Sequence, residues 1–92
     1  MYAHRVHELQ TIVRSCGYCL ALHGSMQRDL DAIAVPWTKR ATTAEVLVER
    51  VCEQMGLIPT NDSPSDKDHG RRVWSLLMGE IGFVDFSVMP RH

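Results

Sequence analysis

The sequence lacks a long apolar run and has almost no excess of charge of either sign. Its 92 residues carry a formal net charge of −1 when histidine is counted as neutral. A strongly basic surface for nucleic acid is therefore not expected, although a local basic patch remains open. No apolar stretch is long enough to cross a membrane, and the N-terminal residues contain no signal-peptide hydrophobic region. We therefore expect a soluble, cytoplasmic protein with no membrane partner.

Cysteine is scarce, and its number is odd: Cys16, Cys19 and Cys52. An odd number without a secretion signal argues against a disulfide framework. The spacing Cys16-x-x-Cys19-x-x-x-His23 resembles zinc ligands, but a structural zinc site needs a fourth ligand. In addition, Cys16 falls at a predicted helix end and Cys19 in an apolar strand. We expect all three cysteines to act as small buried hydrophobic residues.

The hydrophobic fraction of 45% is ordinary for a folded protein and argues against disorder. A chain of 92 residues forms one small domain, with room for a single sheet and two helices. The sequence contains no internal repeat and no low-complexity tract. Residues 1–92 are therefore expected to form a single domain.

Two segments have the apolar spacing of an amphipathic helix. The first covers residues 3–16 and is followed by Gly17, a residue suited to the position just past a helix. The second runs from Ala44 to Met55 and is followed by Gly56. Thr42, with Glu45 three residues later, predicts a capping box at its start.

Four segments are typical of strands: 18–23, 29–35, 72–78 and 82–90. The first is apolar on both faces, which predicts a central position in the sheet. The last two are expected to pair as a hairpin across a tight turn at residues 79–82. Residues 59–70 are predicted to be a long loop between the second helix and the third strand.

The order of elements is helix, strand, strand, helix, strand, strand. It predicts an α+β domain of two layers, with both helices on one face of a mixed or antiparallel four-stranded sheet. Trp37 is expected to pack as a lid over the core, since no neighbouring residue demands that it stack on a base. Trp74 is expected to be exposed, and with short edge strands it leaves a homodimer through the sheet edges open.

Three aspartates carry the most specific chemical pattern. Asp29 and Asp31 are two apart in a predicted strand, so both side chains point to the same face. Two such carboxylates repel each other unless a cation lies between them, and hard oxygen ligands suit Mg²⁺ or Mn²⁺. Asp85 is costly to bury alone in its strand, which is easier to explain if all three acids share metal. The alternative is that Asp29 caps a turn and Asp31 is a solvated edge residue.

Other residues could bind phosphate near these acids. Gly24 would let backbone amides approach a phosphate, with the Ser25 hydroxyl assisting, or it could be a plain turn glycine. Basic residues of the predicted loop and of the strand after it could reach a phosphate over the carboxylate face, or could simply be solvated. These basic residues are Lys67, His69, Arg71 and Arg72.

Gly24-Ser25, followed by Asp29-x-Asp31 and by Asp85 on a later strand, resembles the nucleotidyltransferase superfamily typified by DNA polymerase beta. The family's signature is a Gly-Ser or Gly-Gly turn, an Asp-x-Asp strand and a third carboxylate on a neighbouring strand. The resemblance implies a nucleotidyltransferase-like fold in which the three aspartates are catalytic and hold Mg²⁺ or Mn²⁺.

The resemblance also implies that Gly24, Ser25 and Arg28 bind a nucleoside triphosphate whose nucleotidyl group passes to an acceptor that the sequence does not identify. The chain from Leu22 to Arg91 is further similar to small uncharacterised proteins encoded by tailed phages and prophages. That similarity implies the cytoplasm of a bacterial host as its location.

A second interpretation stays open, because the link Met26-Gln27-Arg28 between the two motifs is shorter than in active family members. It is a catalytically inactive phage module of the same fold that binds a protein or a nucleotide. A nucleic-acid-binding module is disfavoured, because basic and aromatic residues do not interleave on one predicted face.

Overall fold

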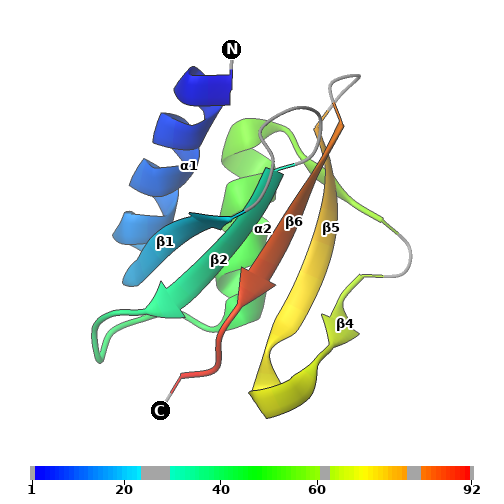
Figure 1. Ribbon diagram of the computed structural model, residues 1–92. Helices are drawn as coiled ribbons and strands as arrows, with labels where there is room; N and C mark the ends of the chain where they lie inside the picture. Colours follow the sequence, from blue (N-terminus) through cyan, green and yellow to red (C-terminus); the bar gives the residue numbers. More distant parts are fainter. Residues whose placement is uncertain (1, 24–29, 61–62, 79–81, 92) are drawn as a thin grey trace.

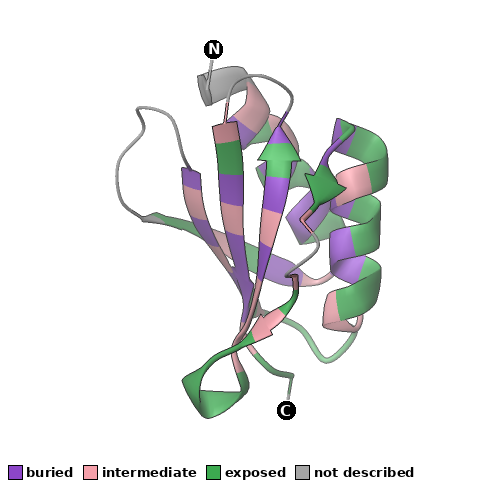
Figure 2. Cartoon of the chain, turned by 90° about the vertical axis from the view of Figure 1, so that its right-hand side faces the viewer, coloured by how far each residue is buried: buried purple, intermediate pink, exposed green. Residues whose placement is uncertain are grey.

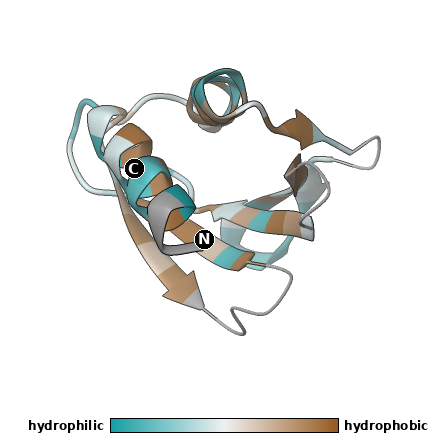
Figure 3. Cartoon of the chain, turned by 90° about the horizontal axis from the view of Figure 1, so that it is seen from above, coloured by the Kyte–Doolittle hydropathy of each residue, from teal (hydrophilic) through white to brown (hydrophobic). Residues whose placement is uncertain are grey.

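The computed structural model describes residues 2–23, 30–60, 63–78 and 82–91. In this part of the chain two α-helices lie on one side of a six-stranded mixed sheet (Figures 1 and 3). The elements are α1 (Tyr2–Ser15), β1 (Tyr18–His23), β2 (Leu30–Pro36), α2 (Ala44–Met55), β3 (Ile58–Pro59), β4 (Ser65–Asp66), the short 3₁₀ helix η1 (Asp68–Gly70), β5 (Arg72–Met78) and β6 (Gly82–Val88). The predicted α+β class, with two helices and a mixed sheet, is confirmed.

The sheet has more strands than the four predicted. Its order is β1-β2-β6-β5-β3, and β4 also pairs with β5. The two extra strands, β3 and β4, fall largely in the segment predicted to be a loop. Each has only two residues, which is too short to produce an alternating pattern in the sequence. The β2–β6 pair is parallel and the other pairs are antiparallel, so the sheet is mixed.

β1 lies at an edge of the sheet, which contradicts its predicted central position. α1 packs over one face of β1, whereas Cys19 and Ala21 on the other face are exposed. The apolar run at residues 18–23 therefore belongs to an edge strand that a helix covers on one face only. Cys19 is consequently not a buried hydrophobic residue as predicted, although Cys16 is buried. Cys52 is half-buried, and this burial raises the pKa of its thiol.

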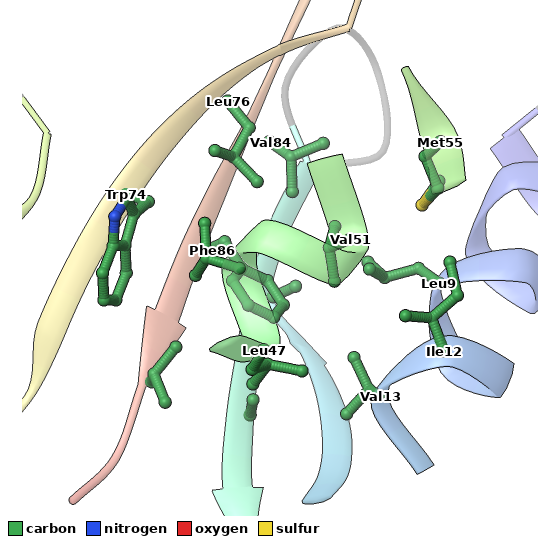
Figure 4. Packing of buried hydrophobic residues seen from close by; sticks show 14 of the residues in the cluster. Leu9, Ile12, Val13, Leu47, Val51, Met55, Trp74, Leu76, Val84 and Phe86 are labelled. Atoms are coloured by element: carbon green, nitrogen blue, oxygen red, sulfur yellow. The ribbon is translucent and has the colours of Figure 1, made fainter. Parts of the chain in front are cut away.

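The core fills the space between the helices and the sheet (Figure 4). The predicted apolar stripes of both helices face it, and they meet the inward side chains of the central strands. Phe86 on β6 lies near its centre and is completely buried. The other fully buried large side chains are Leu9, Val13, Cys16, Tyr18, Leu30, Leu47, Val51, Leu76, Val84 and Val88.

Specific residues set the C-terminal ends of both helices and the start of α2. Gly17 and Gly56 adopt positive φ angles of 87° and 69°, which confirms their predicted helix-ending role. The N-cap of α2 is Thr43, whose side chain accepts a hydrogen bond from the Val46 amide at 3.2 Å. The predicted capping box at Thr42 is therefore wrong, because the helix begins one residue later and the Thr42 hydroxyl donates to the Thr43 carbonyl instead.

The two tryptophans have the opposite exposure to that predicted. Trp74 is 6% exposed and points into the core from β5, with the Arg72 guanidinium over its ring. Trp37 is 75% exposed in the turn after β2 and does not cover the core. An exposed Trp74 was one of the two grounds for a homodimer through the sheet edges, so that ground is removed. No helix in the described ranges has the length and apolar character needed to span a membrane.

Candidate functional site

Asp31 and Asp85 lie side by side on the face of the sheet that the helices leave open. They are direct partners in the parallel β2–β6 pair, and Ser75 on β5 is the antiparallel partner of Asp85. The residues before and after each aspartate are buried in the core, so alternation turns both carboxylates to the open face. Figure 2 shows this alternation of buried and less buried residues along the strands. The expected neighbourhood of Asp31 and Asp85 is confirmed.

The remaining predicted site residues lie outside the described part of the chain. These are Gly24, Ser25, Arg28 and Asp29. The convergence of Asp29 with the other two aspartates, and the phosphate-binding role of the Gly-Ser turn, stay predictions. His23 is the register partner of Asp31 on β1, so the chain enters the undescribed segment at the level of the carboxylate pair.

A polar cleft of about 460 Å³ surrounds the two aspartates. Its remaining lining comes from β5, β6 and the segment between α2 and β5, and it consists of hydroxyl residues, two cations and one valine. These residues are Thr60, Ser63, Ser65, Lys67, Arg71, Val73, Ser75 and Ser87. The cleft therefore places two negative and two positive side chains around one space.

Hydrogen bonds hold the floor and the wall of the cleft in place. The Ser75 hydroxyl donates to Asp85 Oδ1 at 3.2 Å. The Ser63 hydroxyl accepts the Ser75 amide hydrogen at 2.8 Å and lies 3.1 Å from the Thr60 hydroxyl. This chain of contacts joins the wall to the carboxylate. It gives Asp85 a defined orientation.

Among the described residues, the two cations of the cleft form no ion pair with its two carboxylates. Arg71 Nη1 donates to the Ser87 hydroxyl at 3.1 Å. The ion pairs formed among the described residues include neither cation of the cleft and neither of its aspartates. Arg72 by contrast pairs with Glu45 and Asp66 outside the cleft, and Arg72 and His69 do not line it. Of the four basic residues considered from the sequence, Lys67 and Arg71 are placed to meet an anion.

Two carboxylates directly opposite each other on neighbouring strands are mutually repulsive. Like charges side by side on neighbouring strands are destabilising, and the Ser75 hydroxyl donates a hydrogen bond to Asp85. A cation between Asp31 and Asp85 would remove the repulsion. Such a pair has the donor chemistry of a Mg²⁺ site, because Mg²⁺ keeps several waters and takes one or two carboxylates together with substrate phosphates.

The described residues do not supply a complete protein cage for a metal. Within the described ranges, no group of three or more histidine, cysteine, aspartate or glutamate side chains is placed to hold one ion. The pair of Asp31 and Asp85 therefore fits a hydrated ion that also contacts a ligand. It does not fit a closed structural site of four protein ligands.

Alternation along β6 places Ser87 on the same face as Asp85, and both line the cleft, but sequence reasoning missed the other hydroxyl residues. Ser75 occupies an outward position of β5 and lies opposite Asp85 once the hairpin register is known. A serine between Trp74 and Leu76 was the available signal. The sequence contains no such signal for Thr60 and Ser63, because their positions depend on how the segment after β3 folds back along β5.

Comparison with known proteins adds no support to the resemblance to nucleotidyltransferases, which depends on the motifs alone. No protein-family model matches the sequence. No curated protein matches it either.

Proposed function

We propose that this protein binds a nucleoside triphosphate with Mg²⁺ or Mn²⁺ in the polar cleft and transfers its nucleotidyl group to an acceptor hydroxyl. The observation that carries the proposal is the direct pairing of Asp31 with Asp85 on adjacent strands, in one cleft with Lys67 and Arg71. A carboxylate pair suits the metal, and two cations suit the phosphate oxygens. The resemblance of the Gly-Ser, Asp-x-Asp and Asp85 motifs to nucleotidyltransferases supports the same activity.

Each residue of the cleft has a role in this proposal. Asp31 and Asp85, with Asp29 by resemblance, would hold the ion. The chemistry supplied by a bound ion is neutralisation of the charge on the phosphate oxygens. Lys67 and Arg71 bind phosphate oxygens and orient the nucleotide, while Ser75 orients Asp85 through its hydrogen bond.

The reaction itself is an in-line displacement at the α-phosphorus. The acceptor oxygen forms a bond to that phosphorus, and the bond to the bridging oxygen breaks to release pyrophosphate. Asp85 accepts the proton of the acceptor hydroxyl. Gly24, Ser25 and Arg28 would hold the β- and γ-phosphates, as the resemblance implies.

The second candidate is a module that binds metal and nucleotide without transferring a nucleotidyl group. It is favoured by the short link Met26-Gln27-Arg28 between the Gly-Ser and Asp-x-Asp motifs, which leaves little room for a triphosphate site. The two candidates share the binding site and differ in the release of pyrophosphate.

Calorimetric titration with ATP in the presence of Mg²⁺ tests the shared binding step. We expect saturable binding that disappears when EDTA removes the metal, because the two carboxylates repel the triphosphate without it. Asp66→Asn serves as a matched control, because this carboxylate pairs with Arg72 outside the cleft. Lack of binding at millimolar ATP would contradict both candidates, and a pyrophosphate assay on the same sample separates transfer from binding alone.

A further inference from the structure

Trp37 marks a second surface, at the opposite end of β2 from Asp31. It directly follows Pro36, the last residue of β2. Its backbone amide donates to the Gly17 carbonyl at 2.9 Å, and the Thr38 amide donates to the same oxygen at 3.3 Å. A side chain at Gly17 would collide with the backbone of Ala41. The turn that carries Trp37 is therefore fixed against the connection between α1 and β1, while its indole stays 75% exposed.

The surroundings of Trp37 are hollow and positively charged. A cavity of about 560 Å³ is lined by Pro36, Trp37, Thr38, Lys39 and Arg91. Arg91 Nη1 is held by the Ala41 carbonyl at 3.2 Å. Among the described residues the lining contains two cations and no acid, in a chain whose net charge is −1.

An exposed aromatic ring beside cations suits a particular kind of ligand. A nucleobase stacks on an indole face, and its phosphate is attracted to nearby lysine and arginine side chains. A neutral sugar would use the indole but not the two cations. A peptide anchor without an acidic group would likewise use the apolar surface and leave the two cations unpaired.

We propose that Trp37, Lys39 and Arg91 form a binding site for a nucleotide unit, with the base stacked on the indole and the phosphate between the two cations. This site goes beyond the proposed function, because none of its described lining residues also lines the polar cleft. Six residue steps along the chain separate Asp31 from Trp37, a distance of about 20 Å in an extended strand. One mononucleotide cannot occupy both sites. The unit can belong to a free nucleotide or to single-stranded nucleic acid.

Fluorescence tests the stacking directly. The chain has two tryptophans, so Trp74→Phe leaves Trp37 as the only one. Titration with AMP and with an eight-nucleotide single-stranded DNA, without divalent metal, is expected to quench Trp37 to saturation. If the natural ligand is a single strand, the oligonucleotide should bind at least tenfold more tightly than AMP. If the two ligands have equal affinities per nucleotide, the natural ligand is a free nucleotide. Equal quenching by adenosine and AMP would overturn the role of the cations.

Anisotropy of a fluorescein-labelled oligonucleotide tests the site in chains that keep Trp74. Trp37→Ala is expected to weaken binding on the order of tenfold or more, as expected for the loss of one base–aromatic stack. Lys39→Gln should weaken binding and reduce its salt dependence. Arg14→Gln on the exposed face of α1 is the matched charge control and should bind as the unchanged chain does. The proposal would be overturned if Trp37→Ala bound as tightly as the unchanged chain. It would also be overturned if neither the fluorescence assay nor the anisotropy assay showed saturable binding.

The outcome is separable from the proposed function. Asp31→Asn is expected to leave oligonucleotide binding unchanged, because the assay contains no divalent metal and Asp31 lies in the other cavity. Loss of binding in Asp31→Asn together with Trp37→Ala would instead place the strand in the polar cleft and would overturn a separate site.

Discussion

Asp85→Asn is expected to remove metal-dependent nucleotide binding and transfer while the domain stays folded. The amide has the shape of the carboxylate and can still accept the Ser75 hydrogen bond, but it lacks the negative charge that attracts a divalent ion to the pair with Asp31. Pyrophosphate release should fall on the order of 10²-fold, as for other groups that stabilise charge in a transition state. The free energy of unfolding should stay within about 1 kcal/mol of its original value, because the substitution also removes a like-charge pair.

Asp66→Asn provides the comparison for this result. It makes the same chemical change on β4, where the carboxylate pairs with Arg72 and does not line the cleft. We expect it to retain both nucleotide binding and transfer. Calorimetry, a pyrophosphate assay and urea denaturation of both variants separate a role in the site from a role in the fold. Full activity in Asp85→Asn would refute the proposed role of that residue.

Phe86→Ala is expected to produce the largest loss of stability. Phe86 is completely buried at the centre of the sheet, between Ala32 on β2 and Trp74 on β5. Removing the ring leaves a cavity in a packed core and costs about 3–5 kcal/mol. That is a large part of the roughly 5–15 kcal/mol that stabilises a typical domain. The midpoint of urea denaturation should fall accordingly.

Phe83→Ala is the matched control on the same strand. Phe83 occupies an outward position of β6 and is 40% exposed. Its truncation removes the same atoms but opens no buried cavity, so the loss should be clearly smaller. An equal loss in the two variants would show that the core is not centred on Phe86.

Local patterns in the sequence predicted most of the elements but not their neighbours. Apolar periodicity predicted both helices, and alternation predicted which side chains of β2 and β6 face the core. The edge position of β1 depends on α1 covering one of its faces, which no local pattern encodes. The N-cap at Thr43 differs from the prediction by one residue, because two adjacent threonines satisfied the same local rule.

The tryptophans show how a local signal can be overlooked. Trp74 alternates with Leu76 and Met78, and all three point into the core, so the pattern of β5 contained the correct answer. Trp37 follows the proline that ends β2. Its exposure is decided by the attachment of that turn to Gly17, a contact between segments 20 residues apart in the chain.

The outward direction of Asp31 and Asp85 was predictable from alternation, whereas the expectation that their strands are neighbours came from the resemblance and from the argument that the acids share a metal. Asp31 and Asp85 had to face outward once their neighbours were assigned to the core, and the structure places their strands side by side. The positions of Thr60, Ser63 and Ser65, and those of Lys67 and Arg71, depend on how the segment between α2 and β5 folds over the sheet. The sequence offered only their chemical type.

The most direct test of the central claim is an NMR titration of the ¹⁵N-labelled protein with Mn²⁺ in the presence of ATP. If Asp31 and Asp85 hold the ion, paramagnetic broadening will be strongest at the amides of Asp31, Asp85 and Ser75. It will be weaker at α2, on the other face of the sheet, and weaker still at the turn at Trp37. Broadening centred elsewhere, or none at stoichiometric Mn²⁺, would contradict a metal–nucleotide site in the polar cleft.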